Sequence, residues 1–168
     1  MTDLADGLDD HIRSLTLYAR VLVANPADAD DLVQESLRRA LTYSDRDRAY
    51  NWRAYLFRIL HNVRADHLAK KARDREIPID DYVGQLSYPA SQHGFIEFKD
   101  VARALVLLSS EQREVLLLVG LEGLSYAEAA ETLGVPVGTV MSRLNRARQS
   151  LKHILSDLSD GQPGRNSR

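Results

Sequence analysis

The sequence predicts an all-α fold in which two small helical domains are joined by a flexible linker. The helical pattern runs nearly throughout, and the alternating β-branched runs that would indicate strands are absent. Two prolines and two glycines interrupt this pattern between residues 76 and 97. A length of 168 residues accommodates one or two domains of this kind.

Three helices are predicted in the first domain. One runs over about residues 8–23, the second over about 26–43 and the third over about 52–73. Asn25 caps the second helix, and Pro26 occupies its first position. Apolar residues that we expect to face the core are Val33, Leu37, Ala40 and Leu41 on the second helix, and Trp52, Leu56, Ile59, Leu60 and Val63 on the third.

The linker has 22 residues, which as a flexible coil span about 25 Å. A helix begins after it near residue 98, and Ser109 with Gln112 forms an S-x-x-Q capping box that starts the next helix. The final residues are rich in Gly, Pro, Asn, Ser and Arg, a composition typical of a disordered tail. The predicted boundaries are domains at 8–75 and 98–158, the linker at 76–97 and the tail at 159–168.

The most informative segment joins two helices through a tight Gly-Val-Pro turn. Ser125 and Glu128 form an S-x-x-E capping box that starts the first helix, and Gly134 stands where that helix ends. The helical pattern resumes at Val137, and no Asp or Glu occurs from residue 135 to residue 155. A basic helix without acids after a short turn is typical of a helix-turn-helix whose second helix enters the major groove of DNA.

The two faces of this second helix differ in character. Its predicted inner face is Val140, Leu144, Ala147 and Leu151, and its outer face is Thr139, Ser142, Asn145, Arg146 and Gln149. Arg143, Arg148 and Lys152 add further positive charge. The alternative is an αα-hairpin with a solvated basic face, because charged helix faces are common.

Charge is distributed unevenly, although the net charge is only −2. Residues 1–37 hold eight acids against two arginines, whereas residues 44–75 hold nine basic residues against four acids. Separate acidic and basic regions suit one protein partner and one polyanion.

The chain has no Cys, no histidine pair at metal-ligand spacing and no catalytic motif, so we expect neither an enzyme nor a metal or cofactor site. It has no membrane-spanning run and no signal peptide, so we expect a cytoplasmic protein.

Two clusters carry these opposite charges. Acidic and amide side chains lie on the outward side of the second helix at Asp30, Asp31, Gln34 and Glu35, and they indicate a protein-binding surface. Favourable charge at a helix N-terminus explains Asp30 but not Gln34 or Glu35, which lie beyond the first turn.

On the third helix Arg58, Asn62 and Asp66 form a stripe, and Lys70 and Lys71 add the charge that a phosphate backbone attracts. Asn62 and Asp66 are suited to hydrogen-bond the edges of unpaired bases.

Together these segments resemble an extracytoplasmic-function (ECF) sigma factor of the sigma-70 family, of the minimal type with regions 2 and 4. DADDLVQE resembles region 2.2, WRAYLFRILHNVRADHL regions 2.3 and 2.4, and the segment from Leu108 to Leu151 region 4. The general-stress subgroup of alphaproteobacteria is the most similar, on SYPASQHGFIEFKDVARAL and NRAR. The fold implied is a region 2 bundle and a region 4 helix-turn-helix.

The resemblance implies a role for each cluster. Asp30, Asp31, Gln34 and Glu35 would dock on the β′ clamp coiled coil of core RNA polymerase. Promoter DNA at the −10 element would meet Arg58, Asn62, Asp66, Lys70 and Lys71, and at the −35 element Thr139, Ser142, Arg143, Asn145, Arg146 and Arg148. Met141 and Ala69 depart from the pattern, because family members often carry a basic residue at both positions.

The expected function is therefore to direct transcription initiation at specific promoters, those of a stress response, with an anti-sigma factor as a further partner and no membrane association. One alternative is a sigma-like decoy that binds an anti-sigma factor and never DNA. Another is a dimeric operator-binding regulator that uses only the helix-turn-helix. The basic second helix argues against the decoy, and the first domain would have no purpose in the regulator.

Overall fold

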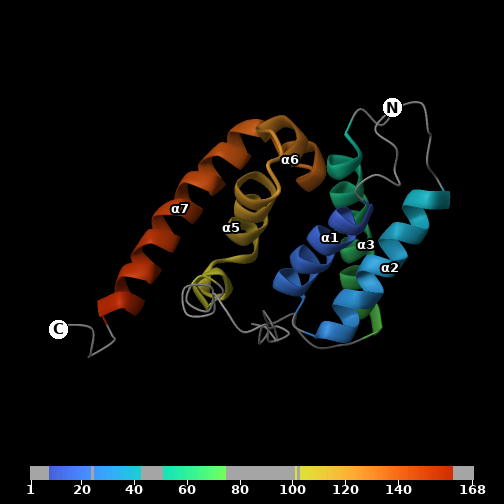
Figure 1. The fold of residues 1–168 in the computed structure, drawn as a ribbon, viewed down its shortest axis with the longest axis horizontal. Helices are drawn as coiled ribbons and strands as arrows, with labels where there is room; N and C mark the ends of the chain where they lie inside the picture. The colour runs from blue at the N-terminus through green and yellow to red at the C-terminus, as the bar shows by residue number, and fades with distance from the viewer. Residues whose placement is uncertain (1–7, 24, 43–50, 75–100, 102, 161–168) are drawn as a thin grey trace.

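The computed structural model describes residues 8–23, 25–42, 51–74, 101 and 103–160 (Figure 1). All regular structure within these ranges is helical, which confirms the all-α prediction. The predicted linker at 76–97 lies outside the described residues. The last helix reaches Asp160, so the first two residues of the predicted tail are helical, and residues 161–168 lie outside the described part.

Helices α1 (Leu8–Leu22), α2 (Pro26–Thr42) and α3 (Trp52–Asp74) form an N-terminal bundle. The Asn25 side-chain oxygen accepts a 2.9 Å hydrogen bond from the Ala27 amide, so the predicted cap of α2 is confirmed. Inside the bundle the rings of Tyr18 and Phe57 pack edge to face, with 5.1 Å between ring centroids.

The predicted inward positions are confirmed with one exception. Val33, Ala40, Leu56, Leu60 and Val63 are buried, and Leu37, Trp52 and Ile59 are half-buried. Leu41 is 65% exposed, so its inward placement was wrong. Successive residues of an α-helix are rotated by about 100° around its axis. Because Ala40 faces the core, the next residue, Leu41, is turned away from it.

The C-terminal block comprises a short helical stretch at 103–107, then α5 (Ser110–Val115), η1 (Leu116–Leu121), α6 (Tyr126–Leu133) and α7 (Val137–Asp160). The Ser109 capping box is confirmed, since Ser109 and Gln112 exchange hydrogen bonds between side chain and backbone. The apolar segment after Val115 is not a continuation of the α-helix but a π-helix, with Glu122 N–H bonded to the Leu117 carbonyl at 2.9 Å.

The two blocks pack against each other. Helix α3 lies against α6 and α1 contacts α5, and one apolar core runs through both blocks, with Leu15, Phe57, Leu118 and Val140 among its members. In Figure 1 α2 stands at one side of the molecule and α7 at the other, with α1 and α5 between them. Among the described helices, none is long and apolar enough to cross a membrane.

A buried arginine ties the blocks together. The guanidinium of Arg113 on α5 donates to four backbone carbonyl oxygens, and the side chain is almost fully shielded from solvent. Three of these acceptors lie just before α5, and the fourth is the Val21 carbonyl at the end of α1, at 3.2 Å. Through these hydrogen bonds Arg113 fixes the end of α1 against the second block.

Candidate nucleic-acid interface

The turn between α6 and α7 is set by local signals. The Ser125 hydroxyl accepts from the Glu128 amide at 3.2 Å, and the Glu128 carboxylate accepts from the Ser125 amide at 2.8 Å, which confirms the capping box. Gly134 ends α6 in the left-handed region at φ 65°, a conformation that favours glycine. The Pro136 carbonyl then accepts from the amide of Thr139 at 2.9 Å, which starts α7. The predicted helix-turn-helix connection is therefore confirmed.

Helix α7 buries one face and presents the other to solvent. Val140, Leu144 and Ala147 are buried and Leu151 is half-buried, as predicted. Of the side chains predicted to meet the −35 element, Ser142, Asn145, Arg146 and Arg148 are exposed, whereas Thr139 and Arg143 are half-buried. The Arg143 guanidinium donates to the Glu111 carboxylate at 2.6 Å and is thereby held against α5. Four of the six predicted side chains are thus available on the surface of α7.

The five side chains predicted for the −10 element all lie on α3, but the structure does not gather them on one open surface. Arg58 points toward α6, where its guanidinium binds the Glu131 carboxylate. Asp66 and Lys71 face α2, where Asp66 binds Arg39 and Lys71 binds Asp28. Asn62 and Lys70 are exposed. Arg58 is thus the member of this set that forms an ion pair with the C-terminal block.

Four side chains at or near α3 donate hydrogen bonds to glutamates of the C-terminal block. The donors are Asn51, which directly precedes α3, and Arg53, Arg58 and Arg64 within it, and the acceptors are Glu128, Glu122, Glu131 and Glu114. Two of these acids are buried, Glu114 with 8% and Glu122 with 2% of its side chain exposed. Burial raises the pKa of Glu122, and a nearby Arg53 guanidinium opposes that rise. These pairs were not predicted from the sequence. The basic character of the third helix indicated that acidic partners would lie elsewhere in the chain, but not which acids they were.

The predicted protein-binding face on α2 is largely open. Asp30, Asp31 and Gln34 are exposed, and Asp30 lies 3.3 Å from Arg20. Hydrogen bonds from Arg38 and then Arg39 hold the pKa of Glu35 at about 2. Arg39 also donates to Asp66 at 2.8 Å, so it bridges the acidic face of α2 and the polar stripe of α3. This bridge was not predicted, because residues 27 positions apart give no local signal.

Comparison with known proteins assigns each of the two blocks to a protein-family model. Residues 8–74 match the family model "Sigma-70 region 2", and residues 98–151 match "Sigma-70, region 4". The ECF RNA polymerase sigma factor EcfG of Rhodopseudomonas palustris (strain TIE-1) is 41% identical over 157 residues, which are 90% of this chain and 87% of the relative.

Two solved structures are similar over most of the chain. The sigma factor RpoE of Bartonella quintana, in complex with the anti-sigma factor NepR, superimposes with a TM-score of 0.79 and 31% identity, covering 93% of this chain and 98% of that one. CnrH in complex with the cytosolic domain of CnrY gives a TM-score of 0.62 and 30% identity, covering 92% of this chain and 88% of that one. This chain therefore belongs to the sigma-70 family, as an ECF RNA polymerase sigma factor that directs promoter-specific transcription initiation and is not itself an enzyme.

Proposed function

We propose that this sigma factor reads the −35 element with α7, engages the −10 element with α3 and docks on the β′ clamp coiled coil of core polymerase with α2. The observation that carries the proposal is the outer face of α7, which is exposed, polar and cationic and follows a capped, glycine-ended turn. A helix in this position is suited to the major groove, where its first turns meet base edges. Helix α2, which carries the acidic residues, stands at the opposite side of the molecule from α7, so polymerase and the −35 duplex do not compete for space (Figure 1).

Within α7 we assign base contacts to Ser142, Asn145 and Arg146, which share the outer face, and a phosphate contact to Arg148. An arginine can donate two hydrogen bonds to guanine in the major groove, and asparagine can pair with adenine in the same way. Thr139 and Arg143 are half-buried, and a contact to DNA from Arg143 requires its guanidinium to leave Glu111.

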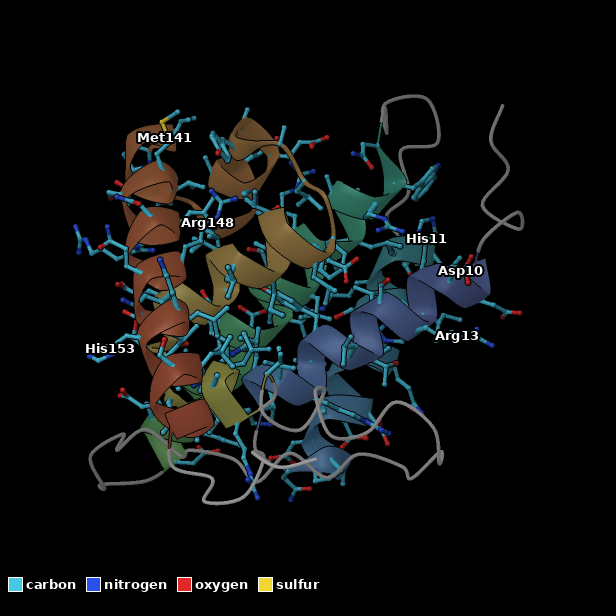
Figure 2. The ribbon with its side chains drawn as sticks, turned by 60° about the vertical axis from the view of Figure 1, so that its left-hand side comes forward. Asp10, His11, Arg13, Met141, Arg148 and His153 are labelled. Carbon is cyan, nitrogen blue, oxygen red and sulfur yellow. The ribbon has the colours of Figure 1, made fainter. Side chains whose placement is uncertain are left out.

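The Arg146→Ala variant is expected to bind a cognate −35 duplex about 5- to 150-fold more weakly, equivalent to the roughly 1–3 kcal/mol of one bidentate base contact. Fluorescence anisotropy with reconstituted holoenzyme measures this loss. Arg13→Ala is the matched control, because Arg13 is an exposed arginine on α1, far from α7 in Figure 2. Equal affinity of the two variants would show that Arg146 does not contact the element.

At the −10 element we assign base recognition to Asn62 and Asp66 and backbone contacts to Arg58, Lys70 and Lys71. Extruding a base from the stack costs a few kcal/mol, so an easily opened step is favoured. Arg58 can reach DNA only after its guanidinium leaves Glu131. A contact from Arg58 to the −10 element therefore requires this ion pair between α3 and α6 to break.

The Asp31→Lys variant is expected to weaken binding to core polymerase more than about tenfold, since a like charge brought into an interface costs several kcal/mol. Asp31 is exposed on the face of α2 that also carries Gln34 and Glu35. Titration of labelled protein with core enzyme measures the affinity. Asp157→Lys, an exposed charge reversal near the end of α7, is expected to leave that affinity unchanged. If both variants bind core polymerase as the parent does, α2 is not the docking face.

We further propose that a small anti-sigma protein controls this chain at stress-response promoters in the cytoplasm. Support comes from two similar structures, RpoE and CnrH, which were solved with NepR and with the cytosolic domain of CnrY. The decoy alternative is disfavoured by α7, since a protein that never meets DNA has no need of an exposed, acid-free, cationic helix there.

A further inference from the structure

Two large apolar side chains are exposed in the first two turns of α7. Val137 is 41% exposed and Met141 is 51% exposed, although the inner face of the helix is already filled by Val140 and Leu144. Figure 2 shows Met141 at the end of α7 nearest the turn, with its sulfur directed away from the body of the protein. Residues four apart on a helix are neighbours, so the two side chains form one apolar strip.

This strip lies beside the polar face that the proposed function places in the major groove. At about 100° per residue, Met141 is rotated by only about 40° from Asn145 around the helix axis. The N-terminal residues of a groove-binding helix are those that contact base edges. With α7 placed in the major groove, Met141 therefore lies level with the base edges rather than with the phosphates.

Among the four bases, thymine alone carries an apolar group on its major-groove edge, the C5-methyl, and apolar side chains recognise it by contact. We propose that Met141, supported by Val137, is a specificity-determining residue that reads a thymine methyl group in the −35 element. The inference rests on the proposed placement of α7 and adds a base identity to it. Met141 offers no donor to guanine or adenine and no charge to phosphate, so a methyl group is the feature of DNA that it fits best.

The test removes only the methyl group. Promoter duplexes are selected from a random pool by reconstituted holoenzyme, and each thymine of the −35 element is then replaced singly by deoxyuridine. For the parent protein one position is expected to lose about fourfold in affinity, the value of one buried methyl group. Met141→Ala is expected to bind the thymine and deoxyuridine duplexes equally, and Met141→Leu is expected to retain the discrimination.

Leu107→Ala is the matched control, because Leu107 is 64% exposed but lies outside α7, and this variant should discriminate as the parent does. The inference is overturned if Met141→Ala keeps the parent's sensitivity to deoxyuridine, or if the parent ignores every such replacement while still binding the element. Failure of the parent to bind any −35 sequence would instead contradict the proposed function, so the two failures are distinguishable.

Discussion

The Arg113→Met variant is expected to lose about 3 kcal/mol or more of unfolding free energy, because four backbone carbonyls lose the hydrogen bonds that the buried guanidinium donates. The four hydrogen bonds measure 2.8, 2.9, 2.9 and 3.2 Å, and they join the entry to α5 with the end of α1. Chemical denaturation followed by circular dichroism measures the loss.

Two further variants separate this role from a general effect of removing charge. Arg113→Lys is expected to recover only part of the stability, because a lysine ammonium has three donors and lacks the planar fork of a guanidinium. Arg73→Met, at an exposed position near the end of α3, should change stability by less than about 0.5 kcal/mol. An Arg113→Met protein as stable as the Arg73→Met protein would contradict the role given to Arg113.

Replacing Glu114 by alanine is expected to destabilise the protein by about 3–5 kcal/mol, since it leaves the Arg64 guanidinium partly desolvated without its carboxylate. Arg64 is only 17% exposed and Glu114 only 8%, so solvent screens this pair between α3 and α5 weakly. Glu111→Ala on the same helix is the matched control. Its pair with Arg143 has a carboxylate 63% exposed, and its loss should cost less than about 1 kcal/mol.

A second measurement distinguishes opening of the two blocks from general destabilisation. The chain contains no Cys, so the substitutions Asp31→Cys and His153→Cys provide two unique labelling sites, one exposed on each side of the molecule (Figure 2 shows His153 on α7). Energy transfer between dyes at these sites is expected to fall in Glu114→Ala under conditions where both blocks remain folded. Unchanged transfer and stability would show that the pair does not hold the blocks together.

Sequence reasoning succeeded where the signal is local and failed where it is tertiary. The caps at Asn25, Ser109 and Ser125 and the stop at Gly134 depend on residues within one turn, so they were predicted correctly. Leu41 was misplaced because apolar character alone does not show which of two adjacent residues faces the core, and Ala40 takes that position. The π-helical turn at Leu116–Leu121 was missed, since an apolar run carries no sign of its hydrogen-bond register.

The contacts between the two blocks could not be predicted from the sequence, because they too are tertiary. Arg64 and Glu114 are 50 positions apart, and Arg58 and Glu131 are 73 apart. No spacing rule links residues at such separations.

For the proposed function, Ser142, Asn145 and Arg146 of the −35 set are exposed in this arrangement. Arg58, Asp66 and Lys71 of the −10 set are instead held in ion pairs. Under the proposed function, binding at the −10 element requires ion pairs to break, whereas binding at the −35 element by Ser142, Asn145 and Arg146 does not.

Run-off transcription with purified core polymerase tests the central claim most directly. Templates are promoters selected by the holoenzyme, and the protein is supplied free of any inhibitor. The parent protein is expected to direct transcripts of one defined length, Arg146→Ala to give far fewer, and core polymerase alone to give none. Failure of the parent to direct initiation from any selected template would contradict the account.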